Sequence, residues 1–137
     1  MDEILFDESE NIRNKLQQEM MQFNLPYLKL RNPKPFSFYY QDNAKNIIAG
    51  ITGYYANKYA RVDYTWVHEN YRHKKLGKKL FTALEFFLRE HHCEFIQLDT
   101  FDFQAKPFYE KLGFICVGMV PKWIEGHDCY FMRKRIS

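Results

Sequence analysis

A change of hydrophobic period in the middle of the chain constrains the fold more than any other feature. Residues 59–68 are rich in aromatic and β-branched side chains, which predicts a strand. Apolar residues then recur every three or four positions through residue 92, at Leu76, Leu80, Leu84 and Phe87 or Leu88. This spacing predicts a helix over residues 76–92. The chain must therefore turn from a strand into a helix within a few residues.

The remaining segments predict a sheet with helices on either side of this turn. We expect strands over residues 36–41, 46–55, 59–68, 94–100, 114–119 and 129–135, and further helices over 9–23 and 103–112. Ser9 is a candidate N-cap of the first helix, and Gly113 is a candidate left-handed cap after the last helix. Pro26, Pro33 and Pro35 predict an irregular connection before the first strand.

Short turns join the first three predicted strands, so these strands should be antiparallel. The helix over 76–92 lies between two strands, and a connection of that length crosses over between parallel strands. The sequence therefore predicts an α+β fold, with a mixed, mostly antiparallel sheet, a central strand-helix-strand crossover and flanking helices.

Length and composition predict one packed domain over residues 1–137. The 137 residues are 46% hydrophobic and 18% aromatic, and smaller pieces could not each bury a core. The apolar runs are far shorter than the ~20 residues that cross a bilayer, and the acidic start does not resemble a signal peptide. We therefore expect a cytoplasmic protein with no membrane partner. Cys93, Cys116 and Cys129 are widely spaced, so we expect neither a disulfide framework nor a metal.

The charge distribution indicates an anionic ligand. The formal net charge is only +3, yet five cations lie within eight positions: Arg72, Lys74, Lys75, Lys78 and Lys79. This cluster is at the start of the helix over 76–92, where the helix dipole disfavours each cation by about 0.3–1 kcal/mol. A solvated charged face is one interpretation. A bound polyphosphate explains the arrangement better, because free N–H groups at a helix start also bind anions.

Two motifs identify a family that this chain resembles. The segment from Val67 to Leu80, followed by Phe108-Tyr-Glu-Lys-Leu-Gly-Phe114, is similar to the GNAT superfamily of acyl-CoA-dependent N-acetyltransferases, in its small single-domain bacterial type. In that family an Arg/Gln-x-x-Gly-x-Gly/Ala turn holds the pyrophosphate of coenzyme A. Arg72 and Gly77 match its first and last positions, and Lys75 replaces the middle glycine. The resemblance implies a GNAT-type sheet and acetyl-CoA as the acyl-donor cosubstrate.

The resemblance also implies roles for individual residues. Acetyl-CoA would contact Val67, His68, Arg72, His73, Lys74, Lys75, Leu76, Gly77, Lys78, Ala105 and Tyr109. The amide of Val67 would donate to the developing oxyanion, and Tyr109 would protonate the departing thiolate. Core packing beside Phe108 and Phe114 is the alternative for Tyr109. Asp102 occupies a position where many relatives carry an asparagine that touches the cofactor.

The base that deprotonates the amine is less well defined by the sequence. Asp63 is our candidate, because one branch of the family places a carboxylate on the strand before the turn. Glu69, His68 and Asp99 are rivals, and each could equally be solvated or salt-bridged. Strand alternation predicts that Asp63, Thr65 and Val67 share one face.

The acceptor is expected to be a small-molecule or peptide amine, and the protein a monomer or homodimer. Four aromatic residues either line the acceptor pocket or pack in the core: Tyr54, Tyr55, Tyr64 and Trp66. Two other classes remain open: a catalytically inactive acyl-CoA-binding or interaction domain, and a nucleic-acid-binding module that uses residues 72–79. We expect no nucleic-acid partner.

Overall fold

The computed structural model describes residues 3–29 and 31–137, and the chain divides into two units at residues 31 and 32. The first unit contains helix α1, Glu10–Leu28. Ser9 caps α1 as predicted, since its Oγ accepts the N–H of Asn11 at 3.3 Å. The helix continues past its predicted end at residue 23 and includes Pro26. A proline so close to the C-terminus removes one backbone hydrogen bond, but its fixed φ still suits a helix.

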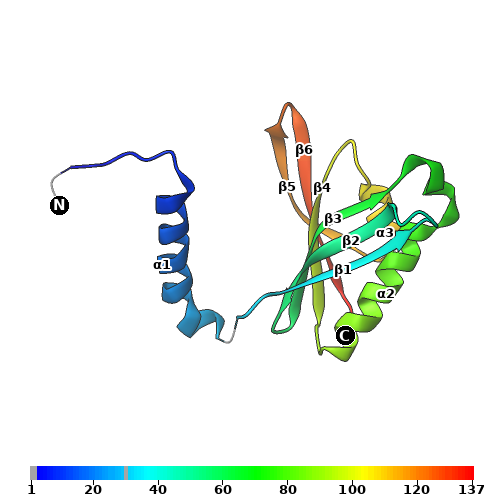
Figure 1. Ribbon diagram of the computed structural model, residues 1–137, viewed down its shortest axis with the longest axis horizontal. Coiled ribbons are helices and arrows are strands. Elements are labelled where there is room, and N and C mark those ends of the chain that lie inside the picture. Colours follow the sequence, from blue (N-terminus) through cyan, green and yellow to red (C-terminus); the bar gives the residue numbers. More distant parts are fainter. Residues whose placement is uncertain (1–2, 30) are drawn as a thin grey trace. The chain divides into compact units, whose positions relative to one another are not determined.

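The second unit is a six-stranded sheet with helices packed on it (Figure 1). Its strands are β1 Lys34–Gln41, β2 Ile47–Ala56, β3 Tyr59–Val67, β4 Phe95–Phe101, β5 Ile115–Ile124 and β6 His127–Arg135. Their order is β1-β2-β3-β4-β6-β5, and within the described residues β3 and β4 form the only parallel pair. The predicted α+β class and the central crossover are therefore confirmed.

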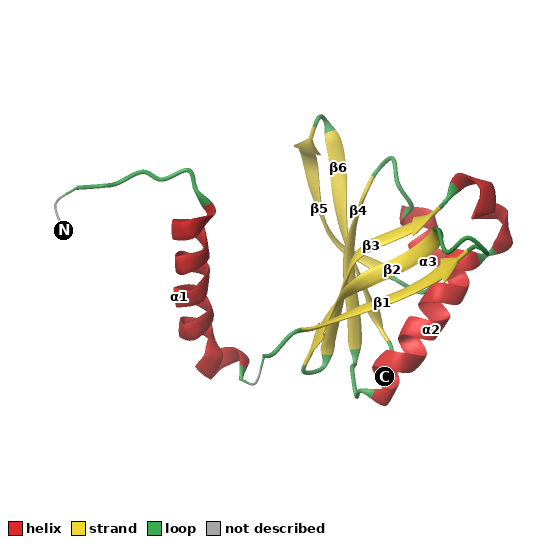
Figure 2. Cartoon of the chain, viewed as in Figure 1, coloured by secondary structure: helices red, strands yellow, loops and turns green. Residues whose placement is uncertain are grey.

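Two helices and one 3₁₀ helix complete this unit (Figure 2). They are η1 Glu69–Lys74, α2 Leu76–Glu90 and α3 Lys106–Lys111. Gly113 has a φ of 99° just after α3, as expected for a left-handed cap. The sequence did not predict η1, and β5 runs on through Pro121, which an edge strand tolerates. Among the described residues, no helix combines the length and apolar character needed to span a bilayer.

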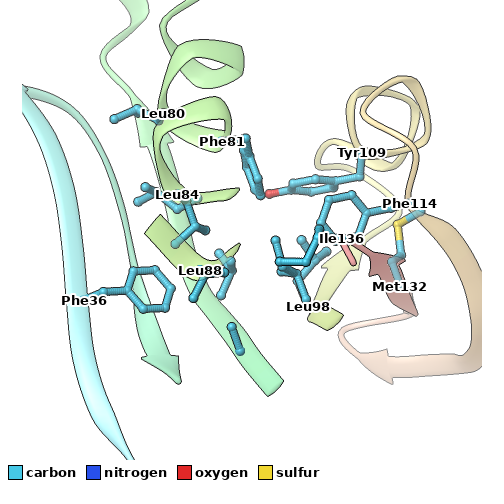
Figure 3. Close-up of a cluster of buried hydrophobic side chains, with 14 of the residues drawn as sticks. Phe36, Leu80, Phe81, Leu84, Leu88, Leu98, Tyr109, Phe114, Met132 and Ile136 are labelled. Carbon is cyan, nitrogen blue, oxygen red and sulfur yellow. The ribbon is translucent and has the colours of Figure 1, made fainter. Parts of the chain in front are cut away.

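The hydrophobic core lies between the sheet and the helices (Figure 3). Leu80, Leu84 and Leu88 form the buried side of α2, as their spacing predicts. Phe81 of the same helix meets the rings of Tyr109 and Phe114 edge-on, with centroids 5.8 Å away in each case. Each large apolar side chain buried in this way contributes about 1.5–3 kcal/mol to stability. This core ties α2 to α3 and fixes the start of α2 over the sheet.

The two parallel strands separate along their length, and this separation creates the opening on which the site depends. β3 pairs with β4 only where Tyr59–Arg61 lie beside Phe95–Gln97. Both strands continue beyond these residues, and Figure 1 shows them diverging. The later residues of β3 therefore have main-chain groups that no neighbouring strand on the β4 side satisfies.

A β-bulge in β3 reverses one prediction. Gly53 of β2 pairs with Val62, whereas the preceding residue Thr52 pairs with Tyr64, so Asp63 is the extra residue. The chain crosses so closely here that a Cβ on Gly53 would lie 1.9 Å from the carbonyl oxygen of Arg61. The extra residue shifts the alternation of side chains. The expectation that Asp63 shares a face with Thr65 and Val67 is therefore wrong.

Candidate active site

The start of α2 is open for an anion. Lys75 occupies the N-cap position, no side chain caps the helix, and its first turn contains no acidic residue. The first N–H groups of a helix have no partner within the helix, and together with the helix dipole they attract negative charge. The start of α2 therefore has uncapped N–H groups beside the cations of the turn.

The backbone conformation of Lys75 explains why a glycine is usual at this position of the motif. Its backbone is left-handed, with φ 58° and ψ 29°. This conformation costs a residue with a Cβ about 1 kcal/mol, whereas glycine adopts it freely. Lys75 therefore holds a strained backbone conformation and adds a cation to the turn.

The structure brings the predicted turn residues together between β3 and α2. Arg72 ties the turn to the strand, since its Nε donates to the carbonyl oxygen of Val67 at 3.0 Å. His68 Nδ1 accepts the N–H of Asn70 at 3.1 Å and so starts η1. The Nζ of Lys74 lies 5.1 Å from the centroid of the Tyr71 ring. The basic residues of η1 and of the start of α2 are exposed around this turn: Arg72, His73, Lys74, Lys75, Lys78 and Lys79.

Leu76 and Gly77 are buried, so they can serve an anion only through their backbone. A Cβ on Gly77 would lie 3.1 Å from Cζ of Phe108 in α3. That distance is tighter than an ordinary van der Waals contact. Gly77 therefore has a packing role that the motif did not reveal: it lets α3 approach the start of α2.

The N–H of Val67 faces the opening between β3 and β4. His68 donates its N–H to the carbonyl oxygen of Ile48 at 2.8 Å. Bonded and non-bonded pairs alternate along an antiparallel ladder, so the next pair, Val67 with Ala49, is non-bonded. Both main-chain groups of Val67 consequently point away from β2. Arg72 takes the carbonyl, which leaves the N–H directed toward the opening.

Tyr109 of α3 approaches β3 from the helix side of the sheet, near Thr65. It is only 8% exposed, and burial raises the pKa of its phenol above the usual 10.0. The Thr65 hydroxyl opposes this rise, and Asp99 adds to it. Thr65 Oγ1 is buried and has no hydrogen-bond partner in good geometry among the described residues, so its interaction with Tyr109 is weak. Tyr109 is thus a core residue whose phenol keeps its proton at neutral pH.

Asp63 lies on the other side of the sheet, in a cluster of charges. Nε of Arg61 contacts Oδ1 of Asp63 at 3.2 Å, and its Nη2 contacts Oδ2 of Asp99 at 3.1 Å. The structure therefore joins two of the carboxylates predicted as rivals through one guanidinium. Their two strands are far apart in sequence, and no motif signalled Arg61.

The loop after β4 contains a second cluster. Asp102 accepts the N–H of Asp128 at 3.0 Å, and its Oδ1 lies 2.8 Å from Nδ1 of His127. These contacts, the N–H of Asp128 first, lower the pKa of Asp102. Ala105 precedes α3, and its N–H approaches the hydroxyl of Thr100 at 3.4 Å. The sequence pattern did not predict the pairing of Asp102 with His127.

The four aromatic candidates separate into two groups. Tyr55 packs edge-on against Phe87 of α2 and against His91, which follows the helix, so it belongs to the packing on the helix side. The others are 47–75% exposed, at positions where the strand alternation directs them to the opposite face: Tyr54, Tyr64 and Trp66. No group of three metal-ligating side chains occurs among the residues that the structure describes.

Comparison with known proteins gives a consistent result. The model of the acetyltransferase (GNAT) family matches residues 1–114. Blasticidin-S acetyltransferase from Streptomyces morookaense is 26% identical over 112 residues, which are 81% of this chain and 82% of that protein.

Solved structures share the fold. The crystal structure of an acetyltransferase from Bacillus cereus ATCC 14579 matches with a TM-score of 0.89 and 27% identity, and the match covers 97% of each chain. A protein of Bacillus anthracis str. Ames, solved in complex with acetyl coenzyme A, matches with a TM-score of 0.66 and 22% identity, over 76% of this chain and 64% of that chain. The sheet with its crossover is therefore a fold that acetyltransferases use.

Proposed function

Because the chain belongs to the acetyltransferase (GNAT) family, we propose that it transfers an acetyl group from acetyl-CoA to an amine. The observation that carries this proposal is the convergence at the opening between β3 and β4. The Val67 N–H faces that opening, the Tyr109 hydroxyl lies near Thr65 of the same strand, and the uncapped start of α2 follows the turn after that strand. Acyl transfer needs these three elements: an anion anchor, an oxyanion donor and a proton donor.

The residues present fit acetyl-CoA. The uncapped amides of α2 and the cations around them suit a pyrophosphate. The buried hydroxyl of Thr65, which has no hydrogen-bond partner in good geometry among the described residues, and the phenol of Tyr109 provide polar atoms in an otherwise apolar surrounding. Buried polar atoms of this kind are normally satisfied by a ligand or a water. The Bacillus anthracis relative, which was solved with acetyl coenzyme A, supports the same ligand.

Bound acetyl-CoA would supply an activated carbonyl and a thiolate leaving group. The Val67 N–H donates to the carbonyl oxygen, where negative charge develops. Tyr109 gives its phenol proton to the sulfur as the C–S bond breaks, and it is reprotonated from solvent afterwards. Its raised pKa keeps that proton in place at neutral pH. The hydrogen bond from Arg72 to Val67 holds the strand end in position.

Asp63 takes up a proton from the substrate ammonium, which leaves a neutral amine to attack the carbonyl; the second proton of the amine passes to water once the new C–N bond forms. Its carboxylate lies on the face opposite Thr65, together with Arg61 and Asp99. An amine that enters from this face meets a carboxylate before it meets the carbonyl. The transfer runs through water, because a side chain on this face does not reach across the sheet.

The acceptor is a small-molecule or peptide amine. The similarity to blasticidin-S acetyltransferase makes blasticidin S a useful member of a test panel. The exposed rings of Tyr54, Tyr64 and Trp66 offer flat apolar surface on the same face of the sheet as Asp63, which suits an acceptor that combines a cation with a planar group.

Free-thiol release from acetyl-CoA over a panel of amines tests the proposal. The panel should contain polyamines, aminoglycosides, blasticidin S, amino acids and peptide N-termini. We expect at least one amine to stimulate thiol release, and calorimetry to show binding of coenzyme A that Gly77→Glu abolishes. Binding without turnover of any amine would instead indicate an inactive acyl-CoA-binding domain. No binding at low salt would refute the proposal.

A further inference from the structure

Helix α1 presents an apolar stripe that its own unit does not cover. Five large apolar residues recur at intervals of four, four, three and four positions: Ile12, Leu16, Met20, Phe23 and Tyr27. Among the described residues of this unit, nothing buries any residue of α1. The intervals place all five on one side of the helix. Phe23 and Tyr27 are in ring contact, with centroids 5.9 Å apart.

A helix of this kind needs a partner. Isolated helices of fewer than ~12–15 residues are marginal in water, and longer ones still gain most of their stability by packing an apolar face. The ion pairs of α1 lie on the surface and contribute little: Lys15 with Glu19 at 2.8 Å, and Glu10 with Arg13 at 3.8 Å. Packing of the stripe must therefore supply the missing stability.

The two ends of this unit have opposite charges. Glu3, Asp7, Glu8 and Glu10 are at the N-terminal end, where no basic residue lies among the described positions 3–10. Lys29 and Arg31 follow the C-terminal end, and residues 20–31 contain no acidic side chain. A chain segment with this distribution is complementary to a second copy of itself that runs in the opposite direction.

We propose that α1 pairs with α1 of a second copy, antiparallel about a two-fold axis near the middle of the helix. The midpoint of Glu10–Leu28 is residue 19, so the axis brings Met20 close to Met20 of the second copy. It also brings the acidic end of one copy beside Lys29 and Arg31 of the other. An isologous contact of this type buries the same surface of both copies and closes at two subunits.

Sedimentation velocity of the full chain tests the packing of the stripe. We expect the wild type to sediment as a dimer at micromolar concentration. Leu16→Asp places a charge in the stripe and should raise the dissociation constant by at least ~tenfold, which leaves a monomer. Gln18→Asp is the matched control, because Gln18 lies on the side of the helix away from the stripe. This control should stay dimeric.

Charge reversal tests the direction of the pair. Glu8→Lys with Glu10→Lys should weaken the dimer at low salt, and so should Lys29→Glu with Arg31→Glu. The chain that carries all four substitutions should recover wild-type affinity, because the ends are again complementary. If the helix dipole alone were responsible, the fourfold variant would not recover. The substituted charges at both ends of α1 would then be unfavourable to the dipole. Failure of the fourfold variant to recover therefore contradicts the proposal.

Disulfide trapping tests the position of the axis. Met20→Cys in a Cys116→Ser background should form a covalent dimer under mild oxidation, since Cys116 is the exposed native cysteine. A wild-type monomer at all concentrations would show that the stripe is covered within one chain, and the proposal would be wrong. A dimer that survives Leu16→Asp, or one that does not cross-link through position 20, would also overturn it.

Discussion

The two sides of the proposed reaction site are built in different ways. The anion-binding side is continuous in sequence, since residues 67–78 contribute the strand end, the turn and the helix start. The acceptor side is discontinuous: Asp63 and Asp99 come from different strands and share Arg61 between them. Tyr109 comes from a third segment. A local motif therefore specifies the proposed cofactor-binding turn, whereas tertiary packing decides which side chains lie at the proposed reaction site.

Of the substitutions that distinguish the two sides of the site, Tyr109→Phe should have the largest effect on activity. The substitution keeps the buried ring and removes only the proton donor, so kcat should fall by ~10²-fold. Coenzyme A should bind with unchanged affinity, because the anion-binding side is intact. Steady-state kinetics together with calorimetry would separate the two sides. An unchanged kcat would make Tyr109 a packing residue only.

Asp63→Asn should have the next largest effect, and it should depend on pH. We expect kcat/KM to fall by ~tenfold at the acidic end of the profile, where few amines are neutral, and to recover partly as the pH rises. Arg61 would keep its contact with Asp99, so the fold should persist.

Glu69→Gln is the control for Asp63→Asn, since Glu69 belongs to η1 on the anion-binding side. Its pH profile should match that of the wild type. A normal profile for Asp63→Asn and a depressed acidic limb for Glu69→Gln would exchange their roles.

Lys75→Gly should separate backbone geometry from charge within the turn. Glycine relieves the left-handed strain, so thermal unfolding should show a gain of up to about 1 kcal/mol. The same change removes a cation, and the affinity for coenzyme A should fall a few-fold at low salt and less at high salt. Lys75→Ala loses the charge but keeps the strain. Equal melting temperatures for the two variants would mean that the strain has no cost.

The pH dependence of stability should show the smallest effect. The pKa of Tyr109 is raised in the folded state by burial. Its contribution to the free energy of unfolding is therefore fully present below about pH 10 and is lost as the pH rises through the folded-state pKa. Melting temperatures measured from pH 8 to 11 should fall more steeply for the wild type than for Tyr109→Phe. Parallel curves would indicate that Tyr109 is not shielded from solvent.

Much of the fold could be predicted from the sequence, because its signals are local. Three of these signals depend only on neighbouring residues. They are the leucine spacing of α2, the N-cap at Ser9, and the left-handed Gly113 between α3 and β5. The cluster of cations at the start of α2 could be predicted for the same reason. Even Lys75, the departure from the motif, occupies the left-handed position that the usual glycine implies.

Only the tertiary structure decided the rest. The bulge at Asp63 arises from the register between β2 and β3, and one extra residue is enough to move a side chain to the other face of a sheet. The pairing of Arg61 with Asp99, and that of Asp102 with His127, joins residues 38 and 25 positions apart. Such contacts depend on strand order and register, which a pattern of neighbouring residues does not encode. The sequence by itself therefore determined most of the elements and the basic turn before α2, and the assembled sheet determined which face each candidate reactive group occupies.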